Sequence, residues 1–145
     1  MQTFTDSAGR LWTLQINVDA IKRVRALTKI DLLDVFDGQL IERLASDPIC
    51  LCDVLFALVK PEADSRSVTD ADFGRALAGD VIDLATAALL EELVSFFPQG
   101  KRLVLQKALA KYRRLEEKAL ALARHQLDDP QLEARIEAAL SSAGS

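Results

Sequence analysis

"LEELVSFFPQGKRLVLQKAL", residues 90–109, decides how this 145-residue chain is divided. Apolar residues recur at helical spacing on both sides of the stretch, and Pro98 and Gly100 interrupt that spacing. A proline lacks the amide hydrogen of a helix and disfavours helical backbone at the residue before it. We therefore predict a break near residues 97–100 and two domains, a hairpin plus helical domain at 1–98 and a helical extension at 99–145.

The composition is that of a folded, mainly helical protein. Half of the residues are apolar and 28% are charged, which is typical of a globular chain and not of a disordered one. The longest apolar stretch, residues 49–59, is interrupted by Asp53 and is shorter than the roughly 20 residues of a membrane-crossing helix. The start of the chain has no signal-peptide pattern. We expect a soluble, cytoplasmic protein with no membrane partner.

Charge is distributed unevenly along the chain. Residues 1–100 carry 9 Lys and Arg against 16 Asp and Glu, whereas residues 101–126 carry 8 basic and 2 acidic residues. An acidic body followed by a basic helix can pair within one molecule, between two molecules, or with a separate anionic partner.

The first sixteen residues predict a β-hairpin. Phe4 precedes the turn sequence "DSAG", and Trp12, Leu14 and Ile16 alternate with polar residues after it. A hairpin alone is marginally stable in water, so its apolar face is expected to lie on the helices that follow, with Trp12 as the anchor.

The first helices are predicted from start and stop signals. Asn17 is expected to cap a helix whose apolar residues face inward and whose cations face outward. The inward residues are Val18, Ile21, Val24 and Leu27, and the outward ones are Lys22, Arg23 and Arg25. Residues 28–38 predict a loop with one helical turn closed by Gly38, followed by a short helix.

Asp47 and Pro48 begin a helix that is apolar nearly all round, which predicts a central position in the domain. Pro61 is expected to end this helix, and the polar residues after it are expected to form a surface loop.

Two more helices precede the break. Thr69 is expected to cap a helix that closes at Gly79, and Asp80 is expected to cap the next one. The inward residues of that helix are predicted to be Ile82, Ala85, Leu89, Leu93 and Phe96, with a second set of Val81, Leu84, Ala88 and Phe97. Glu91 and Glu92 are expected on its solvent side.

A long helix is predicted over residues 101–126, and Asp129 with Pro130 begins a short last helix. Apolar residues of the long helix form a narrow seam that resembles a coiled coil. They are Leu105, Ala108, Tyr112, Leu115, Ala119 and Leu122. The seam either folds back on the acidic body or projects to pair with a second copy or with a helix of another protein. The predicted fold is thus mainly α, with a short N-terminal β-hairpin, a multi-helix bundle, a long C-terminal helix and a short terminal helix.

No catalytic, metal or cofactor site is predicted. Cys50 and Cys52 would point about 200° apart on a helix, so they are expected to stay reduced and buried. His125 has no nucleophile or orienting partner in the sequence, and Asp70 and Asp72 fit a helix start better than a calcium loop. We therefore predict a protein that is not an enzyme.

The basic helix is a candidate nucleic-acid site, but three observations argue against it. The chain is acidic overall, its cations are expected to spread around the helix, and only Tyr112 offers an aromatic ring beside them. Nucleic acid is therefore not expected as a partner, although an oligomeric helical adaptor or regulator that contacts nucleic acid stays open as the alternative.

The adjacent Phe96 and Phe97 would point about 100° apart on a helix, so we expect one to fill the core and the other to reach a partner. The residues predicted to bind partners are Phe96, Phe97, Leu105, Tyr112, Leu115 and Leu122.

Three stretches carry a resemblance to a family. They are "WTLQINVDAIKRV", "LLDVFDGQLIERLASDPICLCDVLFALVKP" and "VTDADFGRALAGDVIDLATAALLEELVSFFP". The last has an acidic helix start before a Phe, a Gly-Asp hinge, and an apolar helix that ends in aromatic residues and proline. Over about residues 11–98 this layout resembles the small tail assembly chaperones of long-tailed bacteriophages and prophages.

The resemblance implies a cytoplasmic, non-catalytic protein that is absent from the finished particle. Such a protein holds the long, largely helical tape measure protein soluble while tail tube subunits assemble around it, and several copies act on one client. The basic helix after Pro98 lies outside the stretch that carries the resemblance.

Overall fold

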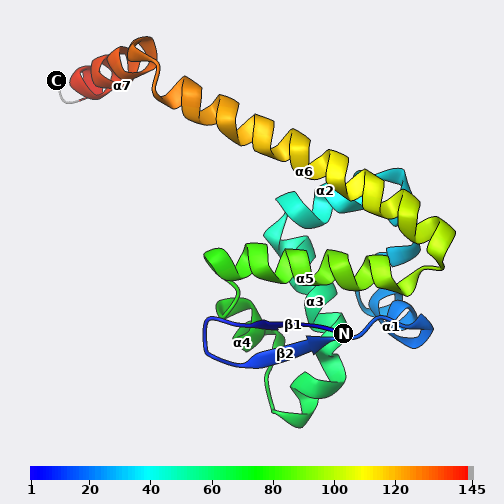
Figure 1. The fold of residues 1–145 in the computed structure, drawn as a ribbon. Coiled ribbons are helices and arrows are strands. Elements are labelled where there is room, and N and C mark those ends of the chain that lie inside the picture. Colours follow the sequence, from blue (N-terminus) through cyan, green and yellow to red (C-terminus); the bar gives the residue numbers. More distant parts are fainter. Residues whose placement is uncertain (144–145) are drawn as a thin grey trace. The chain divides into compact units, whose positions relative to one another are not determined.

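The computed structural model describes residues 1–143 and is mainly helical, with one antiparallel hairpin at the N-terminus (Figure 1). The predicted fold class is confirmed. The elements in chain order are β1 (Gln2–Thr5), β2 (Leu11–Leu14), α1 (Val18–Thr28), the 3-10 helix η1 (Leu32–Asp37), α2 (Gln39–Ser46), α3 (Pro48–Ser65), α4 (Asp70–Arg75), α5 (Asp80–Phe96), α6 (Gln99–Leu127) and α7 (Pro130–Ala143).

The chain forms two compact units, which are described separately. Unit 1 is Met1–Ala108, and unit 2 begins at Leu109 and is described through residue 143. Unit 1 therefore extends beyond the boundary predicted at residue 98, because Leu105 on the first turns of α6 is fully buried. The break between α5 and α6 falls at Phe97 and Pro98, and Gly100 lies inside α6 instead of at the corner.

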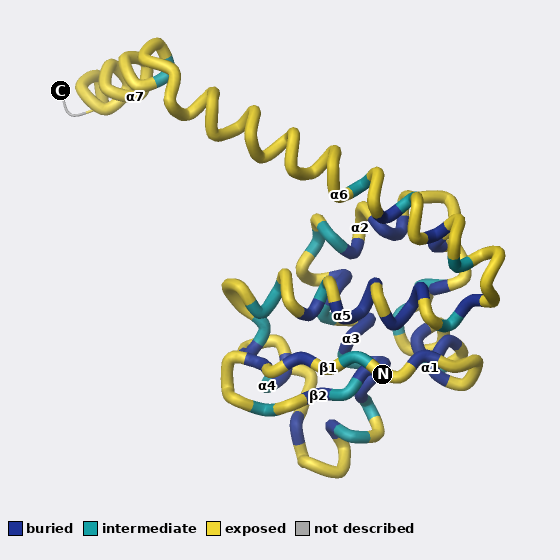
Figure 2. Tube along the Cα trace, viewed as in Figure 1, coloured by how far each residue is buried: buried dark blue, intermediate teal, exposed yellow. Residues whose placement is uncertain are grey.

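α3 lies at the centre of unit 1. It contacts α1, α2, α4, α5 and β2, and buried residues run along it from Cys50 to Ala63 (Figure 2). The prediction from its all-round apolar sequence is confirmed, because Leu51, Val54 and Leu55 are completely shielded from solvent.

The hairpin covers α3 and α5 with its apolar face. Phe4 pairs with Trp12 across the two strands, and β1 contacts α5 while β2 contacts α3. Trp12 has no exposed surface and meets Phe73 of α4 edge to face at 5.4 Å between ring centroids. The guanidinium of Arg66 lies 5.0 Å from the Trp12 ring. Trp12 is thus the anchor that the sequence predicted.

The carboxylate of Asp6 organises the hairpin turn. It accepts hydrogen bonds from the backbone N–H groups of Ala8 and Arg10, each at 2.9 Å, from the Arg10 guanidinium at 3.0 Å and from Trp12 Nε1 at 2.9 Å. Burial raises the pKa of Asp6, but these hydrogen bonds outweigh burial, and the pKa lies below its ordinary value.

α3 continues through Pro61 to Ser65, so the prediction that Pro61 ends this helix was wrong. Pro61 has no N–H to donate to the carbonyl oxygen of Ala57 four residues earlier. Arg23 of α1 supplies the missing donor, because its Nε lies 2.7 Å from the Ala57 oxygen; its terminal nitrogen also lies 2.9 Å from the Leu58 oxygen. The expectation that Arg23 faces outward is corrected by the same contact.

Three of the predicted helix caps are confirmed. Asn17 accepts from the Ala20 N–H at 2.8 Å, Asp47 accepts from the Ile49 N–H at 3.0 Å, and Thr69 forms a capping box with Asp72.

The boundary between α4 and α5 differs from the prediction. α4 ends at Arg75, and the Ala76 carbonyl accepts a hydrogen bond from Ser7 of the hairpin at 2.8 Å. Gly79, at a φ of 62°, is the N-cap of α5 in place of Asp80, whose side chain makes no capping bond.

Several predicted faces of α1 and α5 shift because these two helices are not covered all round. Val18 and Leu27 of α1 and Leu84 of α5 were expected inside, but each is more than half exposed. Glu92 was expected in solvent, but it is only 7% exposed. One Glu92 oxygen accepts the Ile16 N–H at 3.3 Å, and the other lies 3.7 Å from the amino group of Met1.

The role of Arg23 can be tested with a double-mutant cycle. Arg23→Ala is expected to lower the free energy of unfolding by about 2 kcal/mol, because two carbonyl oxygens of α3 lose a charged donor. In a Pro61→Ala background the cost should fall by about half, because the backbone N–H of residue 61 then satisfies Ala57. Urea denaturation measures all four proteins, and an equal cost in both backgrounds would contradict the explanation.

The Asp6 network predicts an acid-sensitive contribution to stability. Since the pKa of Asp6 is lower in the folded state, its contribution is fully present at neutral pH and is lost as pH falls below about 4. Asp6→Asn should unfold at lower denaturant concentration at pH 7, and the difference from the parent protein should shrink toward pH 3. A difference that stays constant over this range would show that the carboxylate charge is unimportant. Asp64→Asn, at an exposed side chain, is the control.

Candidate protein-binding surface

α6 carries an apolar face along its C-terminal half. The helix is continuous from Gln99 to Leu127, so residues on it can be placed at about 100° per residue. Six apolar residues fall within an arc of about 160° on this basis, together with Glu116 and Gln126. We call the six apolar residues the apolar face of α6: Leu115, Ala119, Leu120, Leu122, Ala123 and Leu127.

The apolar face is open to solvent. All six side chains are exposed, and Leu115 and Leu122 keep 55% and 58% of their surface. No side chain from residue 110 to residue 143 is buried, so this described part of unit 2 has no core of its own (Figure 2). An apolar helical arc wider than about 100° is typical of a helix that other helices cover. Exposed apolar surface of this kind marks a site for another chain.

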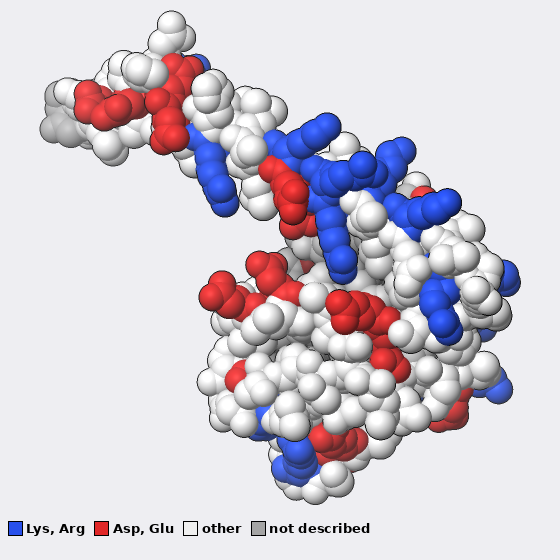
Figure 3. Space-filling model, in the orientation of Figure 1, with Lys and Arg blue, Asp and Glu red and all other residues white. Residues whose placement is uncertain are grey.

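The cations of α6 gather on the opposite half of the helix from residue 107 onward. At about 100° per residue, six of them lie outside the arc of the apolar face. They are Lys107, Lys111, Arg113, Arg114, Lys118 and Arg124, and Figure 3 shows the Lys and Arg side chains along α6. The expectation that the cations spread around the helix was therefore wrong for this part; only Lys101 and Arg102, before it, depart from the pattern.

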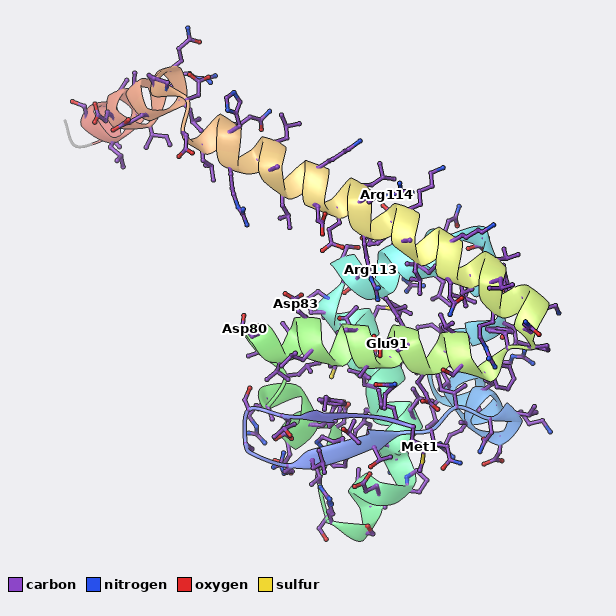
Figure 4. The ribbon with its side chains drawn as sticks, viewed as in Figure 1. Met1, Asp80, Asp83, Glu91, Arg113 and Arg114 are labelled. Atoms are coloured by element: carbon purple, nitrogen blue, oxygen red, sulfur yellow. The ribbon has the colours of Figure 1, made fainter. Side chains whose placement is uncertain are left out.

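Two cations border the apolar face directly. Lys111 lies about 20° from Leu122 on one side, and Arg113 lies about 20° from Leu120 on the other. Arg114, the neighbour of Arg113, leaves the helix on a different side (Figure 4). A cationic border thus runs along both edges of an apolar strip.

The structure separates the residues that were predicted to bind partners. Phe97 is buried, with Phe36 at 4.8 Å and Phe96 at 5.1 Å between ring centroids, and both contacts are edge to face. Phe96 is half-buried, which agrees with one filler and one accessible ring. Leu105 is buried in unit 1 and does not belong to an open surface.

Within unit 2, Tyr112 is half-buried, and Leu115 and Leu122 belong to the apolar face. The predicted seam did not include Leu120 and Leu127, because its alternating steps of three and four residues trace only one narrow line along the helix. A wheel drawn over all residues at helical spacing would have found them.

A second exposed strip lies on α5 in unit 1. Asp80, Asp83 and Glu91 follow one side of this helix (Figure 4), and the exposed Leu84 lies among them. Leu84 was assigned to the core from its spacing, so this acidic strip was not predicted.

The cysteines are poor nucleophiles. Neither is in a disulfide; Cys50 is buried as expected, whereas Cys52 is half-buried. Burial raises the pKa of both thiols, and burial together with Asp70 and Asp53 raises the pKa of Cys52 to about 11. The thiolate needed for attack is therefore scarce at neutral pH.

Other sites that the sequence raised can be placed as well. His125 is exposed on α6. Within residues 1–143, no three His, Cys, Asp or Glu side chains are arranged to hold a metal ion, and no helix has the length and apolar character to cross a membrane. A surface hollow of about 360 Å³ in unit 1 lies between Leu27 of α1 and Phe56 of α3 and is open to solvent.

Comparisons of the chain with protein-family models, with curated proteins and with solved structures give no match.

The raised pKa of Cys52 predicts slow alkylation at neutral pH. Iodoacetamide should modify Cys52 at pH 8 more than tenfold more slowly than a free thiol, because a pKa near 11 leaves well under 1% of the thiol ionised. The rate should rise toward pH 11 for as long as circular dichroism shows a folded chain. Mass spectrometry of Cys50→Ala follows Cys52 alone, and a rate equal to that of glutathione at pH 8 would contradict the prediction.

Proposed function

We propose that this protein is a non-catalytic tail assembly chaperone that binds the tape measure protein during morphogenesis of a phage or prophage tail. The observation that carries the proposal is the open apolar face of α6, from Leu115 to Leu127. The pattern of residues 11–98, which resembles such chaperones, supports it independently.

The chemistry of the surface suits a helical client. A tape measure protein is long and largely helical, and before it is enclosed by the tube its apolar stripes face water. An amphipathic helix such as α6 covers such a stripe by packing alongside it, with apolar residues meeting at intervals of three and four. Binding a client helix would not disrupt internal packing of unit 2 beyond Leu109, because none of residues 110–143 is buried.

Several copies acting on one client would multiply weak contacts. Each α6 offers only a short strip, so one contact is expected to be weak, and repeated sites along an extended client raise the overall affinity by multivalency. Homo-oligomers, contacts with tail tube subunits and a location in the host cytoplasm belong to the same proposal.

Co-expression tests the proposal. The parent protein should raise the soluble fraction of a tape measure protein from the same phage or prophage and should co-purify with it. Leu115→Gln combined with Leu122→Gln should reduce co-purification about tenfold, because two apolar contacts at the centre of the surface are lost. Glutamine keeps helix propensity, and both leucines are exposed, so helix content and stability should be unchanged.

Arg114→Gln, on another side of α6, is the matched control and should bind the client as the parent protein does. No gain in client solubility with the parent protein would refute the chaperone. Equal binding by the double leucine variant and by the control would refute the role of the apolar face.

A second candidate is favoured by the gathering of cations on one half of α6. Six Lys and Arg residues from 107 to 124 are placed to meet phosphates, and a regulator that binds nucleic acid would use that half of the helix. The logarithm of its affinity for a DNA duplex should then fall linearly with the logarithm of salt concentration, with a slope of roughly −3 to −5 for four to six contacts. Fluorescence anisotropy with a labelled duplex measures the slope, and no binding at about 50 mM salt excludes this candidate.

A further inference from the structure

The two edges of the apolar face indicate what kind of chain covers it. We propose that the face takes an amphipathic helix whose apolar stripe is bordered by Asp and Glu. This inference rests on the proposed function and specifies the client segment that the chaperone recognises.

Charge complementarity selects the occupant. Lys111 and Lys118 follow one edge of the apolar face, and Arg113 and Arg124 follow the other. A helix packed along the face brings its own flanking residues against both edges, as residues beside a coiled-coil seam do. Acidic flanks meet cations on both sides, whereas basic flanks meet like charges.

The same edges disfavour a second copy of α6 as the occupant. Two copies packed face to face would bring Lys and Arg borders against Lys and Arg borders in either relative direction. α6 has two acidic residues to offset this repulsion in each copy, Glu116 inside the arc and Glu117 about 20° from Arg124, against six cations from Lys107 to Arg124.

The middle of the face favours a helix over a lipid surface. Ala119 and Ala123 occupy its centre, with leucines on either side. Small residues at the centre let another helix approach closely, and the flanking leucines pack around it. A lipid-binding helix needs bulky apolar residues at its deepest point, and the carboxylate of Glu116 would enter the lipid beside the alanines.

Glu116 adds a requirement on the partner. Its carboxylate would be covered by the bound helix and needs a donor there. A partner stripe with one Lys, Arg or Gln among its apolar residues meets this need. The expected ligand is therefore an acidic-bordered apolar stripe with a single donor within it.

Synthetic helices test the charge rule with the full-length protein. Two labelled peptides share one stripe of Leu and Ala with a single Gln, and differ only in carrying Glu or Lys along both borders. The Glu-bordered peptide should bind at least tenfold more tightly at low salt, and the difference should shrink as salt is raised. Fluorescence anisotropy measures both affinities, and equal affinities would overturn the inference.

Adjacent arginines supply the matched variants. Lys111→Glu with Arg113→Glu reverses one cation on each border and should weaken binding of the Glu-bordered peptide about tenfold, while strengthening binding of the Lys-bordered peptide. Lys111→Glu with Arg114→Glu has the same net charge but leaves the Arg113 border intact, and should weaken binding at most about threefold. Equal losses in the two double variants would show that only net charge matters and would overturn the inference.

The other occupants are outcomes of the same set of measurements. Binding to vesicles of anionic lipid without binding to either peptide overturns the inference in favour of a membrane surface. Self-association that Leu115→Gln abolishes, again without peptide binding, overturns it in favour of a second copy. Client solubility that is unaffected by Lys111→Glu with Arg113→Glu, but lost with Leu115→Gln and Leu122→Gln, overturns the charge rule and leaves the chaperone function standing.

Discussion

The fold of unit 1 depends on α3 remaining helical past Pro61. A proline at this position leaves the Ala57 carbonyl without its helical donor, and a buried carbonyl without a partner is costly. Arg23 fills the gap from α1 and joins the two helices where the helix would otherwise break. The extra turn carries the chain to Val68 and Thr69, from which α4 places Phe73 beneath Trp12. Hairpin, α1, α3 and α4 are thus fixed to one another by a few specific contacts.

The two units satisfy their apolar residues in different ways. Unit 1 encloses Trp12, Phe73 and leucines of α3 and α5 such as Leu55 and Leu89, and it uses polar contacts such as those of Asp6 and Glu92 to close the edges of the hairpin. The described part of unit 2 beyond Leu109 encloses nothing, although its apolar residues are regularly spaced. A regular apolar face without a core leaves its leucines uncovered, and the proposed interaction is therefore assigned to α6.

The long helix combines that face with an ordered charge pattern. Its leucines are exposed and its cations follow both edges of the strip, and the proposed choice of partner rests on these two features. Apolar residues spaced by three and four in the sequence identified part of the strip. The complete arc could be defined only because the helix is continuous from Gln99 to Leu127. The face therefore contains Leu115 and Leu122, which were predicted, and also Leu120 and Leu127, which were not.

Local chemistry determined much of this protein from its sequence. The caps at Asn17, Asp47 and Thr69, the hairpin around Trp12 and the break at Pro98 depend on residues close in the chain, so pattern and propensity were sufficient to find them. Tertiary structure decided the features that depend on residues far apart in the chain. Pro61 is tolerated because Arg23 lies beside Ala57, Glu92 is buried because the hairpin gives it a donor, and Leu27 and Leu84 are exposed because no element covers their side of the helix. Helical spacing says which residues share a face, but only the packing of the whole chain decides whether that face is covered.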